Sequence, residues 1–401
     1  MKFSLPGLRN WIIAFSLLVC PAGAAAAGTA DWSSAGRSLA ATQAGTASFY
    51  EMASDLFWRR SDDNRFASYK DLAEPSEDTG WWVKTDYRSY TFPDYGSLSF
   101  SQDYSATLIG YDSPHAMARW GGTLHQGAFY TMSTSNVYTN GQAGSQPYGG
   151  GSDSIKEYGG GFAMEWGDKH DRHGDAVIRL SQLQHTVSYS DADGNSDLVN
   201  YRNWLIAAGI RYYETRLLPK QFFWEPQAGL SLSYVFPYTV SGDDVTYRSG
   251  NKPYVTGRLG IMAGKSYSVN GHAGLLYGRF GVQREMNGTT TGSLHGDGQA
   301  PQTADVGSSH YTWYDMTFGT SLSLGKGNSV WGELTRRSGS NMTSTWSVNG
   351  GLVLKWGGAS RTTRERMKAL KKDPHSIELD IKKNDKRTDL VYNEHIKKNN
   401  Y

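Results

Sequence analysis

The stretch that most constrains the fold of this chain runs from Trp346 to Trp356. Its even-numbered positions are apolar or glycine, with a tryptophan at each end, and its odd-numbered positions are mostly small or polar. Because side chains alternate between the two faces of a strand, this pattern predicts a strand of roughly 10 residues with one apolar face. An aromatic at each rim is typical of a lipid-facing barrel strand. A half-buried strand of a soluble sandwich has the same alternation, so the rest of the chain has to decide.

The N-terminus predicts export. A basic start precedes the apolar run 11–19, and small residues follow, with Ala25 and Ala27 at the spacing of a signal-peptidase site. This order is that of a secretory signal, and the apolar run is too short for a membrane helix. The only cysteine, Cys20, lies inside this signal, so the exported chain would contain no thiol.

Composition favours a sheet protein. The 401 residues include 47 Gly, 25 Tyr and 13 Trp, yet only 38% are hydrophobic. After the signal, no apolar run approaches the roughly 20 residues of a membrane helix. From residue 80 onward we count about 12 candidate strands separated by turn residues, which predicts an all-β fold. The candidate strands are 81–92, 97–110, 118–132, 155–166, 175–189, 201–213, 222–236, 254–266, 271–282, 311–324, 329–337 and 345–356.

The connections between these strands alternate in length. A soluble sandwich has no reason to sort its loops in this way, whereas an outer-membrane barrel has long loops outside the cell and tight periplasmic turns. We therefore predict a 12-stranded antiparallel outer-membrane β-barrel, closed so that every backbone polar group is bonded. The long connections are 133–154, 190–200, 237–253 and 283–310, and the short ones are 111–117, 167–174, 267–270 and 325–328.

The polar face of each strand is predicted to line the lumen. Charges of both signs are tolerated there when water or a plug satisfies them. One strand contains Pro226, which cannot donate to the ladder and therefore requires a bulge or a one-sided position. The predicted lumen-facing residues are Lys84, Asp86, Arg88, Glu165, Arg211, Glu225, Gln227, Arg258, Asp315, Glu333 and Lys355.

Residues 35–66 precede the strands and predict a helix, because small and apolar side chains recur at three- and four-residue steps. Gly36 and Gly45 weaken a long continuous helix, and a surface helix packed on another element is the alternative. The predicted domains are a signal peptide (1–27), a leader with a luminal helix (28–79), the transmembrane barrel (80–357) and a basic periplasmic tail (358–401).

Several short motifs recur in order along the predicted strands. They are Gly110-Tyr-Asp112, Trp120-Gly-Gly122 with Gly127 and Tyr130, Trp224-Glu-Pro-Gln227, Arg258-Leu-Gly260 and Trp331-Gly-Glu333. With these motifs, the sequence over about residues 35–357 resembles the C-terminal translocator barrel of classical autotransporters, the type V secretion proteins of Gram-negative bacteria. The resemblance implies a 12-stranded barrel with an N-terminal helix in its lumen that leads to a surface passenger. It also implies that the barrel-assembly machinery reads the closing strand as an assembly signal, here Trp346, Val348, Leu352, Leu354 and Trp356.

Two features depart from that family. Only about 30 residues separate the signal from the helical segment, too few for a passenger with its own core. About 45 residues follow Trp356, and their basic, aromatic-poor composition favours a disordered or solvated tail.

No catalytic or metal-binding constellation rises above background, so the sequence predicts a non-enzyme without a cofactor. The histidines in the run Lys169–His173 are expected in a solvated turn. The leading hypothesis is an outer-membrane translocator barrel that lacks a large passenger and displays a short N-terminal segment. A passive pore for small solutes is the alternative, and a surface hydrolase built on His295 and His310 with Asp297 or Asp305 is the third.

The partners expected from the sequence follow from this location. They are outer-membrane lipid, the barrel-assembly machinery and, for the tail, a periplasmic protein or peptidoglycan. We expect a monomer, with no nucleic acid partner.

Overall fold

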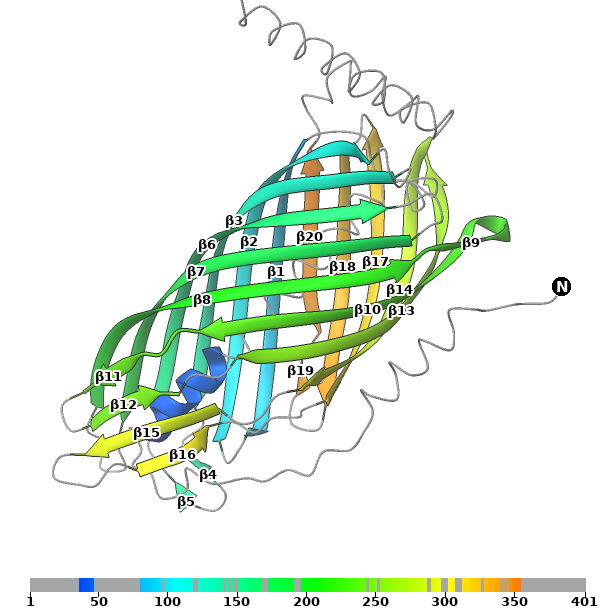
Figure 1. The fold of residues 1–401 in the computed structure, drawn as a ribbon. Helices are drawn as coiled ribbons and strands as arrows, with labels where there is room; N and C mark the ends of the chain where they lie inside the picture. Colours follow the sequence, from blue (N-terminus) through cyan, green and yellow to red (C-terminus); the bar gives the residue numbers. More distant parts are fainter. Residues whose placement is uncertain are drawn as a thin grey trace, which may run out of the picture.

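In a computed structural model of the chain, twelve antiparallel strands form a closed barrel, and a short helix lies inside one end (Figure 1). The structure describes residues 36–46 and 80–354, except 96–97, 118–121, 140–141, 144–145, 148–150, 168–171, 191–195, 243–244, 251–252, 287–289, 297–301, 307–311, 326–327, 340–342 and 345. The barrel strands are β1 (Gly80–Tyr95), β2 (Leu98–Met117), β3 (Gly122–Thr139), β6 (Gly151–Gly167), β7 (Arg172–Ser190), β8 (Ser196–Glu214), β10 (Phe222–Val235), β13 (Tyr254–Val269), β14 (His272–Glu285), β17 (Thr312–Gly325), β18 (Asn328–Gly339) and β20 (Ser347–Leu354).

The last strand closes the barrel by pairing with the first. β20 lies between β18 and β1, with Trp81 opposite Leu354 and Tyr87 opposite Val348. The two-residue strand β19 (Thr343–Ser344) extends the same contact toward the rim. Among the described residues, β20 and β1 share seven register pairs, whereas β7 and β8 share nineteen. The predicted 12-stranded barrel is confirmed, and the two ladders of β20, with seven pairs each, are the shortest between its described strands.

Side chains alternate between lipid and lumen as the sequence predicts. On β17, Tyr314 and Phe318 are 50% and 52% exposed, whereas Asp315 and Thr317 between them are buried. The outer surface is therefore apolar and the lumen polar. The lumen is also tightly packed, since a side chain on Gly351 of β20 would overlap the buried ring of Trp331 on β18.

One turn shows why the short connections can be so tight. Asn270 and Gly271 alone join β13 to β14, and both have positive φ, at 50° and 81°. Positive φ at both central residues defines the type I′ turn, whose twist matches that of the flanking strands. Asparagine and glycine are the residues that adopt this conformation most readily.

The strands are longer than predicted at both rims of the barrel. β3 continues beyond residue 132, β6 begins before residue 155, and β2 contains the predicted turn 111–117. The connection between β7 and β8 shrinks to residues 191–195, and β1 joins β2 through residues 96–97. The extensions carry polar side chains that resemble loop composition although their backbone stays paired. Long and short connections therefore alternate less regularly along the chain than expected.

Two of the predicted long loops contain a sheet of their own. β11 (Thr239–Ser241), β12 (Val245–Ser249), β15 (Thr290–Gly296) and β16 (Gln302–Val306) form a four-stranded antiparallel sheet. This surface sheet lies across the long-loop end of the barrel, beside the helix (Figure 1). A two-stranded hairpin of β4 (Gln142–Ala143) and β5 (Gln146–Pro147) belongs to the connection between β3 and β6.

Pro226 sits where the structure can tolerate it. Its strand, β10, pairs with β13 without interruption, and Pro226 stands opposite Ile261. On the other edge, the ladder breaks between the pairs Trp224–Arg216 and Gln227–Tyr213. There β8 gives way to the short β9 (Arg216–Leu218) and the 3-10 helix η1 (Pro219–Gln221). The missing amide hydrogen therefore faces a gap in the ladder, which is the one-sided position that a strand proline requires.

Several sequence predictions lie outside the described residues. They are the signal peptide with Ala25 and Ala27, residues 47–66 of the predicted helix, Lys355, Trp356 and the tail 358–401. Within the described part of the chain, no helix combines the length and the apolar run that a membrane-spanning helix requires.

Candidate functional site

The helix 36–46 fills the long-loop mouth of the barrel. Every one of its residues is buried. Small side chains allow this close approach: a Cβ on Gly36 would lie 2.5 Å from Leu294 of β15, and one on Gly45 would lie 2.5 Å from Val137 of β3. The helix is thus enclosed by the barrel wall on one side and the surface sheet on the other.

Polar groups of the helix are satisfied in two ways. The hydroxyls of Thr42 and Thr46 donate to the carbonyls of Ser38 and Thr42, at 3.2 and 2.9 Å. Near the C-terminal end of the helix, the barrel wall provides a hydrogen bond to a backbone carbonyl: Gln102 Nε2 donates to Gly45 O at 3.0 Å. Buried polar groups without partners are costly, so these bonds make the enclosed position of the helix possible.

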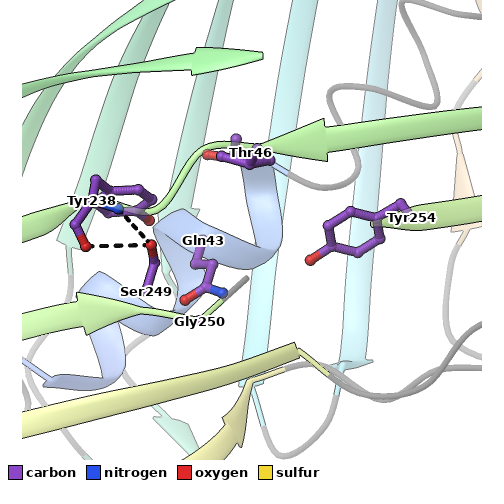
Figure 2. Close-up of a pocket in the computed structure, with 7 residues that line it drawn as sticks. Gln43, Thr46, Tyr238, Ser249, Gly250 and Tyr254 are labelled. Atoms are coloured by element: carbon purple, nitrogen blue, oxygen red, sulfur yellow. Dashed lines mark hydrogen bonds between the residues drawn. The ribbon is translucent and has the colours of Figure 1, made fainter. Parts of the chain in front are cut away.

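The surface sheet holds the helix from the opposite side. The Tyr247 hydroxyl on β12 donates to Gln43 Oε1. Burial raises the pKa of Tyr247 well above its usual value, so this phenol stays neutral and keeps its proton to donate. Next to it, Tyr238 N donates to Ser249 Oγ at 2.9 Å, and that hydroxyl donates to Tyr238 O at 3.3 Å. Figure 2 shows Gln43, Tyr238 and Ser249 among the residues that line a small cleft beside the helix.

An apolar cluster completes the contact. It joins the helix to the barrel wall and to the surface sheet, so removing the helix would expose apolar surface on both. Its members include Leu39, Ala40, Ala41 and Ala44 of the helix, Val137 of β3, and Val240, Val245, Tyr247 and Leu294 of the sheet.

Below the helix, the lumen contains separate networks of charged side chains. One joins β6 to β7, where His185 Nδ1 lies 2.8 Å from Asp153 Oδ2 and the imidazole stacks on Tyr201 with ring centroids 4.3 Å apart. A second centres on Glu157, which accepts hydrogen bonds from two serines and lies 3.4 Å from Arg179 Nη1. These networks cross-link neighbouring strands inside the barrel.

The ten predicted lumen-facing residues that the structure describes are all buried. They do not converge on one site. Asp86 pairs with Arg88 at 2.5 Å, Arg211 with Asp175 at 2.6 Å, and Arg258 with Asp315 at 3.0 Å. Glu165 and Glu333 accept from the hydroxyls of Tyr213 and Tyr277, Gln227 donates to Glu225 at 2.7 Å, and Lys84 Nζ lies over the ring of Trp331.

Sequence reasoning missed several charged residues of the lumen. Asp175 and Arg179 of β7 and Arg279 of β14 belong to strands whose alternation is poor in the sequence. The signal that would have found them is register, because each stands opposite an inward-facing residue of a neighbouring strand. His173, predicted to be solvated, is instead fully buried and stacks on Tyr213 at 5.0 Å. That prediction is wrong because β7 begins at residue 172, three residues earlier than expected.

The two residues of the hydrolase hypothesis that the structure describes, His295 and Asp305, are not brought together. His295 is exposed on β15 and stands opposite Thr246, whereas Asp305 on β16 stands opposite Thr291. A four-residue offset along a strand corresponds to about 13 Å. His310 and Asp297 lie outside the described residues. Among the described residues, no group of three His, Cys, Asp or Glu side chains could hold a metal ion.

The closing-strand residues lie on the outer surface next to β1. Trp346 is 46% and Val348 61% exposed, and Leu352 and Leu354 are half-buried. Their role as an assembly signal stays a prediction.

Comparison with known proteins places this barrel in a family. The Autotransporter beta-domain family profile matches residues 81–335, which is more than half of the chain and runs from β1 into β18. The chain belongs to the autotransporter β-domain family. This confirms the resemblance stated from the sequence, and autotransporter β-domains are outer-membrane barrels.

Curated relatives of this autotransporter barrel are much longer proteins. It is 27% identical over 267 residues to the pertactin autotransporter of Bordetella bronchiseptica, and 24% identical over 287 residues to the BrkA autotransporter of Bordetella pertussis. These alignments cover 64% and 68% of this chain but 26% of each relative. The chain thus matches about a quarter of the length of these relatives.

Solved autotransporter domains share the fold. The β-domain of the Bordetella autotransporter BrkA superposes with a TM-score of 0.55 at 19% identity, over 70% of this chain and all of that one. The translocator domain of NalP from Neisseria meningitidis gives a TM-score of 0.57 at 12% identity, over 76% and 96%. At these identities the likeness concerns the fold alone.

Proposed function

We propose that this autotransporter barrel is a translocator closed by its own helix, which presents the segment before residue 36 at the cell surface. The observation that carries the proposal is the complete burial of the helix 36–46 in the long-loop mouth. Its first residue packs against Leu294 of β15 in the surface sheet, on the side of the long loops. In outer-membrane barrels that side faces the outside.

The proposal needs neither a large passenger nor a catalytic step. A short N-terminal peptide is sufficient cargo, and the role of the barrel is to hold it at the surface. The contacts of Gln102 and Tyr247 with the helix support a closed resting state, because both side chains hydrogen-bond buried polar groups of the helix.

Two measurements test this function. In planar bilayers, the intact chain should conduct little, and deletion of residues 28–66 should raise conductance sharply. Deletion of residues 358–401 is the matched control and should leave conductance low. On whole cells, a Thr29→Cys variant should react with a membrane-impermeant maleimide, whereas a buried Thr317→Cys variant should not. Failure of Thr29→Cys to react would refute surface display.

A passive pore is the second candidate, and the polar lumen below the helix favours it. The wall there carries paired charges of both signs, which suits a hydrated passage. This reading expects steady conductance from the intact chain and little change on deletion of 28–66.

We further propose that the outward face of β20 contacts the barrel-assembly machinery and that the tail has a periplasmic partner. Truncation after Trp356 separates the two roles. If the assembly signal lies in the closing strand, the truncated barrel still assembles, and loss of assembly would place the signal in the tail.

A further inference from the structure

A row of polar and cationic side chains crosses the outer surface of three neighbouring strands. Lys156 of β6 stands in register with Gln184 of β7, which stands in register with Arg202 of β8. Lys156 and Arg202 are exposed and Gln184 is half-buried, whereas Glu157 and His185, next in sequence, are buried in the lumen. Two cations therefore flank an amide on the face that meets the membrane.

The next row toward the short-turn rim has a related composition. Tyr158, Gln182 and Trp204 stand in register on the same three strands, and the two aromatics are 41% and 47% exposed. Gln184 Nε2 lies 3.4 Å from Gln182 Oε1, so the two amides form a ladder between the rows. An amide has two N–H donors and an acceptor oxygen, so this one bond uses only part of the hydrogen-bonding capacity of the two side chains. The remaining capacity on a lipid-facing surface is costly, which indicates a polar ligand at this level of the membrane.

These rows mark the upper edge of the apolar band. Below them, Leu180 and Ile206 are exposed to lipid. Above them, Thr186 Oγ1 donates to Asn200 Oδ1 at 2.9 Å, next to Ser154 in the same register. The cations therefore lie where hydrocarbon gives way to headgroups, on the long-loop side. Because the long loops of an outer-membrane barrel face outward, this is the headgroup level of the outer leaflet.

We propose that Lys156, Gln184 and Arg202 bind a phosphate of an outer-leaflet glycolipid of the lipopolysaccharide class. Two strand spacings place the Cα atoms of Lys156 and Arg202 about 10 Å apart, within reach of one phosphate for two long side chains. Arginine and lysine are the usual phosphate ligands, and the amide between them supplies a further donor. Tyr158 and Trp204 pack against the sugar and the first acyl carbons.

Other outward-facing cations lack this arrangement. Lys265 on β13 stands opposite Phe222 and Leu276, and Arg336 on β18 stands opposite Met316. Each is a single charge among apolar neighbours. Within the described part of the barrel they provide matched controls, since a Lys265→Gln, Arg336→Gln double variant removes the same two charge types from the outer surface.

The test measures glycolipid binding by the purified full chain in nanodiscs, with the thermal shift of its heat-modifiable gel migration as a check on folding. The probes are lipid A with both phosphates, the same lipid A with its phosphates removed, and inorganic phosphate. We expect the phosphorylated lipid to bind at least about tenfold more tightly than the other two, because charged hydrogen bonds are lost without the lipid phosphate. Lys156→Gln, Arg202→Gln should lower the affinity by at least about tenfold.

The controls decide between this site and general charge attraction. The Lys265→Gln, Arg336→Gln variant should bind as the wild type does. Equal losses in both double variants, or full affinity in Lys156→Gln, Arg202→Gln, would overturn the proposal, as would displacement of the lipid by millimolar inorganic phosphate. A Gln182→Leu variant suits a lipid-facing position and should stay folded, so a severalfold loss of affinity there supports the site independently of charge.

Discussion

Replacing Gly45 by alanine should loosen the helix from the mouth of the barrel. A Cβ at this position would lie 2.5 Å from Cγ2 and 3.1 Å from Cγ1 of Val137. Valine is stiff about χ1, and Val137 belongs to a strand paired on both sides, so neither partner can shift easily. Overpacking by one methyl group costs about 1–3 kcal/mol, whereas glycine to alanine in a helix interior gains about 0.5–1 kcal/mol. The clash exceeds the gain by roughly 1 kcal/mol.

This difference is measurable as a change in gating. A net loss of about 1 kcal/mol multiplies the ratio of open to closed time in a planar bilayer by roughly fivefold. Adding Val137→Ala to the same chain makes room for the methyl group, so the double variant should return to low conductance. If Gly45→Ala instead closed the barrel more firmly while Val137 is present, helix propensity would dominate and the packing argument would be refuted.

Three further predictions concern the barrel and its contacts. Arg258→Met should destabilise the barrel by about 3–5 kcal/mol in urea unfolding, because the buried Asp315 loses the countercharge that lies 3.0 Å away, and a second Asp315→Leu change should recover most of the loss. Tyr247→Phe should cost about 0.5–1.5 kcal/mol below pH 10. The raised pKa of the folded-state phenol means that wild-type stability declines as pH rises above the ordinary value of about 10. The phenylalanine variant should show a shallower decline in alkaline urea titrations, since other buried tyrosines with raised pKa values, such as Tyr238, remain. Gly351→Val should slow or abolish heat-modifiable folding through overlap with the Trp331 ring, and a smaller side chain at 331 should restore it.

The fold was predictable where one face of a strand is apolar and the other polar. Tyr314 to Phe318 is such a case, and so is the closing strand. The two faces of β7 were difficult to predict because Gln182 and Gln184 interrupt its apolar outer face. β14 was difficult for the opposite reason: Leu275 faces the lumen.

The inward apolar residues of β14 belong to a second cluster. It packs four side chains inside the barrel, so polarity no longer distinguishes lumen from lipid there, and Arg279 escaped notice among them. The cluster consists of Phe223, Met262, Leu275 and Tyr277.

The site could be predicted only in part. Small residues in 36–46 indicated a helix for a tight space, and all of that segment is enclosed. The surface sheet that encloses it is formed by residues 239–306, whose polar composition resembles ordinary loops. The contact between Gln43 and Tyr247 joins residues 204 positions apart, and no local pattern reports such a pair.

The short joint between β20 and β1 has a consequence for how the barrel comes apart. Backbone amides exchange with solvent at rates set by the cheapest opening that exposes them. A ladder of seven register pairs should open long before one of nineteen, so the amides of β20 should exchange with deuterium well ahead of those of β7. Under mechanical load the cylinder should unzip along the same line. The sequence pattern of β20 predicts a membrane barrel. The same strand is then also the edge at which the closed barrel opens into a sheet.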